Sequence, residues 1–215
     1  MLTLYGNLDS GNVYKVTLLL AQLGIPHRLI ETLQSRGEPG SPQFRAINPI
    51  GKMPTIVFDD GRMLSESGAI LFYFAQGTRF LPADPWRQAN VLRWMFFEQY
   101  RHEPYIAVNR RLRLHSPAPE LARLAERIID NLSRGNQALA VMEQRLSGND
   151  WLAGNCYSIA DIALYAYTHS AVDGGFDLSG YLGIGRWLTR VRDQPGHVGQ
   201  FEQSSAEVIP WPGWR

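Results

Sequence analysis

The chain has 215 residues, a formal net charge of +1 and 45% hydrophobic residues. This near-neutral balance gives no argument for binding nucleic acid or an anionic membrane surface, and no apolar run approaches the roughly 18 residues of a membrane-spanning helix. The single cysteine, Cys156, excludes an intrachain disulfide and a thiolate metal cluster. The N-terminus carries no signal-peptide pattern, so we expect a cytoplasmic protein with no metal, no nucleic acid and no membrane partner.

The first 77 residues alternate short apolar runs with helical patterns. Strands are expected at residues 2–5, 27–31, 54–58 and 62–64, and helices at 12–23, around 43 and from a cap at Ser65 to about Gln76. Asp59-Asp60-Gly61 predicts a tight turn between the last two strands, because glycine tolerates a positive φ. The order strand–helix–strand, then hairpin, then helix suits a four-stranded mixed sheet with helices on its faces.

Helical spacing dominates the rest of the chain. Residues 78–85 are expected to link a first domain, residues 1–77, to an all-helical second domain, residues 86–215. Asp84 followed by Pro85 predicts a helix start, and Ser158 with Asp161 has the spacing of a capping box. Another helix is expected at 184–193. A nearly unbroken apolar stripe predicts one helix packed along a single face: Leu121, Ala125, Ile128, Leu132, Gly135, Leu139, Met142 and Leu146. Its glycine is expected to allow close helix approach.

Several stretches, taken in order, resemble the cytosolic glutathione transferase superfamily. Tyr5–Asn12, Asn48–Pro54 and Glu66–Ile70 look like its N-terminal domain. Trp151–Gly154 with Ser158–Asp161, and residues 187–196, look like its C-terminal domain. The resemblance implies an α/β plus all-α architecture: a thioredoxin-like N-terminal domain of order βαβαββα, followed by a C-terminal α-helical bundle domain.

The resemblance also implies how glutathione is bound. In the family a cis peptide bond precedes the proline at the position of Pro54, which exposes the backbone of the residue before it, here Met53, to the peptide-like backbone of glutathione. Glu66 and Ser67 would bind the γ-glutamyl ammonium and carboxylate, and Lys52 the glycyl carboxylate. Without the resemblance, Glu66 and Ser67 fit an ordinary helix start, Lys52 a solvated loop residue, and Pro54 a trans proline opening an edge strand.

Ser10 lies in the turn after the first strand, where serine-type classes of the family place their catalytic serine. A free thiol has a pKa of about 8.5, so the enzyme has to favour its anion. A hydroxyl hydrogen bond to sulfur beside a helix N-terminus could supply the roughly 2.7 kcal/mol that a shift of about two pKa units requires. We therefore expect Ser10 to be catalytic, with Asn12 as an alternative or assisting donor. From the residues alone, Ser10 also fits a turn or N-cap serine.

The resemblance thus predicts a bacterial serine-type, theta- or beta-like glutathione transferase. Such an enzyme is a homodimer that uses glutathione as co-substrate to detoxify small hydrophobic electrophiles. Two other functions stay open: glutathione-dependent reduction of disulfides or peroxides at the same site, and a non-enzymatic binding or regulatory role. No cysteine occurs in Tyr5–Asn12, which argues against the cysteine-type classes. Pro39 stands where theta-like members have a histidine that contacts glutathione.

Three further expectations concern single residues and the tail. Cys156 is expected to be a small packing residue. His102 is interpreted either as a helix residue at the surface or core edge, or as a wall of the electrophile pocket. The apolar tail is expected to cover that pocket or to pack on the helical domain: Val208, Ile209, Trp211 and Trp214.

Overall fold

The computed structural model describes residues 1–202 and 206–210. The chain divides into two compact units, of which the first contains Met1–Gln76 together with Gln194–Arg215 and the second contains Gly77–Asp193. The expected linker, residues 78–85, therefore belongs to the helical unit. The expected second domain of residues 86–215 is wrong at its C-terminal end, because the chain returns from Gln194 onward to pack on the first unit.

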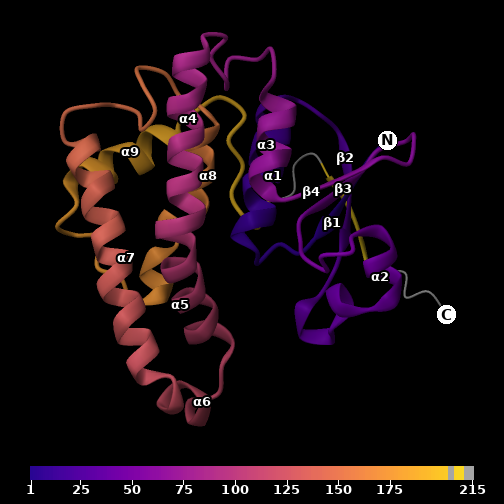
Figure 1. The fold of residues 1–215 in the computed structure, drawn as a ribbon, viewed down its shortest axis with the longest axis horizontal. Helices are drawn as coiled ribbons and strands as arrows, with labels where there is room; N and C mark the ends of the chain where they lie inside the picture. Colours follow the sequence, from indigo (N-terminus) through magenta and orange to yellow (C-terminus); the bar gives the residue numbers. More distant parts are fainter. Residues whose placement is uncertain (203–205, 211–215) are drawn as a thin grey trace. The chain divides into compact units, whose positions relative to one another are not determined.

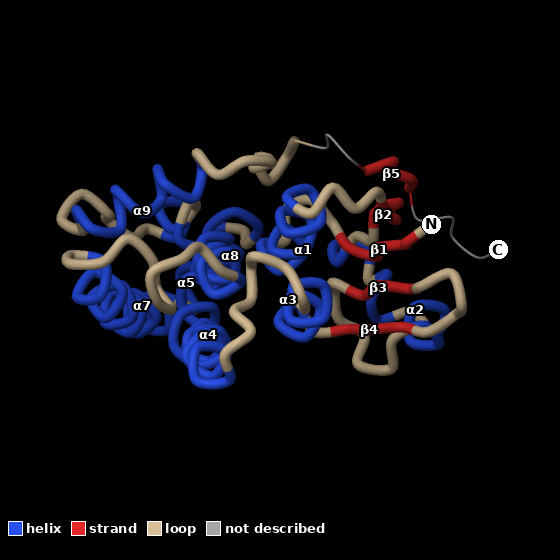
Figure 2. Tube along the Cα trace, turned by 90° about the horizontal axis from the view of Figure 1, so that it is seen from above, coloured by secondary structure: helices blue, strands red, loops and turns tan. Residues whose placement is uncertain are grey.

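From β1 to α3, the first unit has the predicted order of elements. Its helices and strands are β1 (Leu2–Gly6), α1 (Gly11–Gln22), β2 (His27–Glu31), α2 (Pro42–Ile47), β3 (Thr55–Val57), β4 (Met63–Ser65), α3 (Ser67–Ala75) and β5 (Ala206–Pro210). The strand order in the sheet is β4-β3-β1-β2-β5, with β1 parallel to β2 and β3 antiparallel to its two neighbours. Helices α1 and α3 cover one face of this sheet and α2 covers the other (Figure 2).

The sheet has five strands instead of the four expected. Strand β5 runs parallel to β2, with pairs from His27↔Ala206 to Glu31↔Pro210. Val208 and Ile209 therefore form an edge strand in the sheet of the first unit, a pairing that was not expected, while Trp211 and Trp214 lie outside the described residues. The pairing satisfies backbone groups along β2 that would otherwise form an open edge.

The core of the first unit forms where α1 and α3 meet the sheet. Its buried side chains are Leu4, Val13, Val16, Leu20, Leu29, Ile56 and Ile70. Helix α3 begins at Ser67 with Glu66 as its N-cap, one residue later than the expected cap at Ser65. Ser65 is taken up by β4, where it pairs with Thr55, so it does not cap the helix.

The second unit is built from helices (Figure 1). They are α4 (Pro85–Phe97), a π-helical turn (Glu98–His102), α5 (Glu103–His115), α6 (Ala118–Arg123), α7 (Ala125–Leu146), α8 (Ile159–Thr168) and α9 (Leu182–Arg192). Helix α7 packs against α5 and α9, and α4 packs against α8. The single expected stripe is divided at Leu124 between α6 and α7. None of the helices in the described ranges has the length and apolar character needed to cross a membrane.

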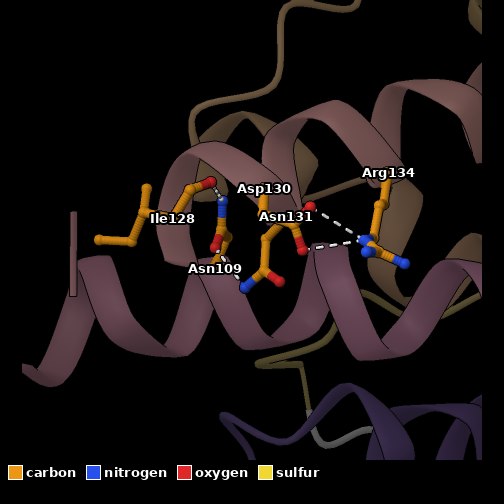
Figure 3. A network of polar contacts seen from close by, with 5 residues as sticks. All are labelled: Asn109, Ile128, Asp130, Asn131 and Arg134. Carbon is orange, nitrogen blue, oxygen red and sulfur yellow. Dashed lines mark hydrogen bonds and ion pairs between the residues drawn. The ribbon is translucent and has the colours of Figure 1, made fainter. Parts of the chain in front are cut away.

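A buried amide pair joins α5 to α7 (Figure 3). The Asn131 amide nitrogen donates to Oδ1 of Asn109 over 2.9 Å, and the Asn109 amide nitrogen donates to the backbone oxygen of Ile128 over 3.1 Å. Both asparagines are buried, so these bonds satisfy groups that would be costly to leave unpaired. On the exposed side of α7, Nε of Arg134 pairs with Oδ2 of Asp130 at 2.8 Å.

The predicted capping box at the start of α8 is present. Asp161 is completely buried and accepts hydrogen bonds from the backbone nitrogens of Leu152 and Ser158, from the Ser158 hydroxyl and from the Trp187 indole. Burial raises the pKa of the Asp161 carboxyl to about 6, although each of these donors favours the anion and lowers it. Asp161 therefore ties α8, α9 and the preceding loop together.

Candidate functional site

The sheet register gathers the three N-terminal stretches at one edge. Thr55, the first residue of β3, pairs with Tyr5 near the end of β1 and with Ser65 at the end of β4. The turn after β1, the loop before β3 and the start of α3 therefore emerge side by side. These segments, together with the first turn of α1, carry every residue that the sequence analysis assigned to catalysis or to glutathione binding.

Ser10 caps α1 at this edge. Its backbone nitrogen donates to Oδ1 of Asn7 over 2.9 Å, and its side chain accepts a long hydrogen bond of 3.4 Å from the backbone nitrogen of Val13. The structure thus shows the capping role that a turn serine commonly has. A hydroxyl that accepts one bond still has its own hydrogen to donate, and the residue is only half-buried. The cap fixes the oxygen at the helix start and leaves this hydrogen able to turn towards a ligand.

Asn12 is the second residue of α1 and contacts the start of α3. Its Oδ1 accepts a hydrogen bond of 2.7 Å from the Lys15 ammonium and one of 3.3 Å from the Ser67 hydroxyl. Ser67 is buried and is the first residue of α3. The N-termini of α1 and α3 therefore meet here, and both turn partial positive charge towards the same place. Lys15 was not singled out from the sequence; a lysine within an otherwise apolar helix run is the signal that could have found it.

Asn48 organises the loop before β3. Its side-chain nitrogen donates to the backbone oxygen of Lys52 and to the Thr55 hydroxyl, each over 2.9 Å. The peptide bond between Met53 and Pro54 is cis, as the resemblance implied. The Lys52 side chain is exposed and that of Met53 is half-buried. The loop is thus held from inside by a buried amide, while Lys52 extends into solvent.

Glu66 has an unusual backbone conformation. Its φ is 70°, and in the part of the chain that the structure describes no other residue except glycine has a positive φ. Such a conformation costs energy in a residue with a Cβ, and strained residues of this kind cluster at functional sites. The Glu66 carboxylate is exposed beside the first turn of α3. An exposed carboxylate next to a helix N-terminus can bind an ammonium group while the helix end binds a carboxylate.

The returning C-terminal segment also supports this edge, which the sequence did not predict. The Gln200 amide nitrogen donates to the backbone oxygen of Leu8 over 2.9 Å, inside the turn that carries Ser10. The Tyr14 hydroxyl donates to the backbone oxygen of Val198 over 2.8 Å. Gln200 is buried, so this contact forms part of the packed unit.

The remaining candidates lie elsewhere in the molecule. His102 is fully buried and contacts the Thr168 hydroxyl over 2.9 Å, so it is a core residue and not an exposed one. Cys156 is exposed, which corrects its expected packing role; the loop before α8 turns its side chain outward. Within residues 1–202 and 206–210, no group of three or more His, Cys, Asp or Glu side chains could hold a metal ion.

Comparison with known proteins agrees with this architecture. Residues 4–78 match the family model described as Glutathione S-transferase, N-terminal domain, and residues 122–195 match Glutathione S-transferase, C-terminal domain. The chain is 33% identical over 192 residues to the disulfide-bond oxidoreductase YfcG of Escherichia coli K12, covering 86% of this chain and 87% of the relative.

Solved structures of glutathione S-transferases are also similar to this chain. The crystal structure of a glutathione S-transferase from Pseudomonas fluorescens Pf-5 is 47% identical, with a TM-score of 0.91 over 94% of this chain and 99% of that chain. A glutathione transferase from Burkholderia graminis, solved with two glutathione molecules per subunit, is 26% identical, with a TM-score of 0.79 over 91% of this chain and 85% of that one. Both family models, the long alignment to YfcG and the shared fold place the chain in the glutathione S-transferase family.

Proposed function

We propose that the protein is a serine-type glutathione transferase that activates the glutathione thiol as a thiolate for attack on small electrophilic substrates. The observation that carries this proposal is the convergence of three segments at one sheet edge, with Ser67 at the start of α3 hydrogen-bonded to Asn12 at the start of α1. This contact brings the groups suited to the γ-glutamyl end of glutathione next to the groups suited to its sulfur.

Glutathione would lie along this edge as an extended peptide. Its γ-glutamyl carboxylate would bind at the N-terminus of α3 and the Ser67 hydroxyl, and its ammonium at Glu66. The backbone of Met53 would pair with the cysteinyl segment, as a short strand pairs with a sheet edge. Lys52 is exposed on the same loop and would bind the glycyl carboxylate. The ligand is thereby held at both ends, which fixes its sulfur near the turn after β1.

The reaction would begin with loss of the thiol proton to solvent. The Ser10 hydroxyl would donate to the resulting thiolate, and the N-terminus of α1 would stabilise the same negative charge. The sulfur electron pair then forms a bond to an electrophilic carbon, and the leaving group departs with the electrons of the bond that breaks. Ser10 neither forms nor breaks a covalent bond in this scheme.

The test compares Ser10→Ala with a matched capping serine. Ser41 caps α2 in the same unit, where its side chain accepts from the Phe44 backbone nitrogen over 3.2 Å. We expect Ser10→Ala to bind glutathione but to lose roughly a hundredfold in turnover of a chlorodinitrobenzene substrate, which is the usual cost of removing one donor to a reacting anion. Ser41→Ala should lose a similar amount of stability, about 1 kcal/mol, without this loss of turnover. Wild-type turnover in Ser10→Ala would refute the proposed role.

A second candidate function is reduction of disulfides. It is favoured by the 33% identity to an enzyme named as a disulfide-bond oxidoreductase and by the related structure with two bound glutathione molecules. Two glutathione thiols would supply two electrons, so that glutathione disulfide forms while the substrate disulfide becomes two thiols. Ser10 and Asn12 would then both face sulfur atoms.

Calorimetric titration separates these functions. Binding of one reduced glutathione per subunit, tighter than the oxidised form, supports conjugation. Binding of two reduced molecules, or a preference for the oxidised form, supports disulfide reduction. Failure of both forms to bind at millimolar concentration would leave only a non-enzymatic role for this fold.

We also propose that the protein works as a homodimer. Large apolar side chains that a monomer would leave in water include Tyr73, Phe96 and Tyr100, with exposed fractions of 46%, 69% and 75%. Exposed aromatic side chains are typical of surfaces that bind another protein. Light scattering after size-exclusion chromatography should give twice the 24.3 kDa mass of the chain. A monomer mass at micromolar concentration would reject the dimer.

A further inference from the structure

Lys15 is a buried cation next to the proposed site. Its side chain is 1% exposed, and its neighbours along α1 include the buried Val13, Val16 and Leu18. A charged side chain in such surroundings costs free energy unless good partners compensate it. Its place in the first half of α1 adds a further cost, because the helix dipole disfavours positive charge near the N-terminus. An apolar residue would pack here at lower cost.

Lys15 contacts Asn12, the second residue of α1. The Lys15 ammonium donates to Oδ1 of Asn12 over 2.7 Å, and the Ser67 hydroxyl donates to the same oxygen over 3.3 Å. An amide whose oxygen receives two donors has a defined orientation, with its NH₂ group on the other branch. Lys15 and Ser67 therefore fix which end of the Asn12 side chain can donate to a ligand.

We infer that Lys15 is a positioning residue that holds the Asn12 amide so that its NH₂ group donates to the glutathione sulfur. The inference rests on the proposed function, because it assigns a role within the same glutathione site. The inference also says that the two donors to Asn12, Lys15 and Ser67, respond differently when glutathione binds. A γ-glutamyl carboxylate at the start of α3 competes for the Ser67 hydroxyl, whereas the Lys15 ammonium has several hydrogens and makes the shorter, charge-assisted bond. The bond from Lys15 is thus the one of these two that persists when glutathione binds.

The test uses Lys15→Met, Asn12→Ala and the double variant. Methionine has a similar length and needs no partner, so Lys15→Met should fold with an unchanged or raised Tm. It should bind glutathione with nearly the wild-type Kd. The pKa of the bound thiol, read from the ultraviolet absorption of the thiolate, should rise, and kcat should fall by roughly tenfold. Thr17→Val, a buried change in the same helix whose hydroxyl bonds the Tyr14 backbone oxygen, should leave both quantities unchanged.

The double variant shows whether Lys15 acts through Asn12. In the Asn12→Ala background, Lys15→Met should cause no further change in thiol pKa or kcat. A full additional loss there would show that the charge acts on the sulfur directly, and it would overturn the positioning role. Wild-type thiol pKa and kcat in Lys15→Met would overturn it as well.

Two measurements keep this result separate from the proposed function and from failure to fold. If the wild-type protein binds no glutathione, the proposed function itself fails, whatever the variants do. A wild-type protein that forms the thiolate and a Lys15→Met variant that does so equally well refute only the inference. Should Lys15→Met not fold, a crystal structure of the wild-type glutathione complex decides. Loss of the contact between Lys15 and Oδ1 of Asn12 in that complex would reject the role, and its retention with the amide nitrogen at the sulfur would support it.

Discussion

Substitution of Gly6 by alanine should disturb the turn that carries Ser10. Gly6 ends β1, and a Cβ atom at this position would lie 2.5 and 2.8 Å from the two methyl carbons of Val13 in the first turn of α1. Val13 is buried and β-branched, so it has little freedom to rotate away. Overpacking of this kind costs about 1–3 kcal/mol, and replacing glycine within a strand returns about 0.5–1 kcal/mol. We expect a net loss of about 1–2 kcal/mol in the free energy of unfolding.

The matched control is Gly40→Ala in the same unit. A Cβ atom on Gly40 would meet nothing within 4 Å, so this variant should be neutral or slightly more stable. Urea denaturation should therefore give a lower midpoint for Gly6→Ala than for Gly40→Ala, and glutathione turnover should fall only in Gly6→Ala. Adding Val13→Ala to Gly6→Ala should cost less than the sum of the two single changes, because it makes room for the new methyl group. Equal stability and turnover in the two glycine variants, or strict additivity in the double variant, would refute this reasoning.

Three other predictions test the helical unit and the returning tail. Gly135→Ala places a Cβ 2.4 Å from the Phe176 ring and should lower the free energy of unfolding by about 1–2 kcal/mol, after allowing for the higher helix propensity of alanine. The control is Gly185→Ala, whose Cβ meets nothing within 4 Å and which should be neutral or stabilising in chemical denaturation. Because burial raises the pKa of Asp161 to about 6, its protonated form stabilises the fold below about pH 4 and that stabilisation is lost as the pH rises through 6. As the pH rises from below 4 to above 6, the wild type should therefore lose about 3 kcal/mol of unfolding free energy relative to Asp161→Asn. A stability difference between the two proteins that does not change with pH would contradict the raised pKa. Gln200→Ala should speed hydrogen exchange at residues 7 to 10, since it removes the bond to the turn; unchanged exchange would show that the tail does not stabilise it.

Local signals in the sequence predicted most of the fold. Asp84 before Pro85 marked the start of α4, and Ser158 with Asp161 marked that of α8, because caps are chosen by residues within one turn. Boundaries failed where a competing partner was distant in the sequence. Ser65 is an acceptable cap by itself, but pairing with Thr55 extends β4 through it and moves the start of α3 to Ser67.

The fifth strand shows the same limit over a longer distance. Residues 206–210 have the composition of a strand, yet nothing near them in the chain indicates what they pair with. Their partner is β2, which lies about 180 residues earlier and pairs with them in parallel register from His27 to Glu31. A tail rich in apolar residues therefore predicts burial or pairing without predicting the element that provides it.

For the candidate site, the sequence predicted the segments but not the contacts between them. The segments that carry Ser10, Met53 and Ser67 were identified because their order in the sequence resembles the N-terminal domain of the glutathione transferase family. The contacts that assemble them depend on side chains from different elements, such as the Asn12 oxygen shared by Lys15 and Ser67. The residue type alone does not tell a buried lysine from a surface lysine. A lysine within the apolar face of a helix is buried, however, and its burial costs free energy unless a polar partner is present. A charged residue in an otherwise apolar run of a helix therefore predicts that the fold places a polar partner beside it, as it places Asn12 beside Lys15.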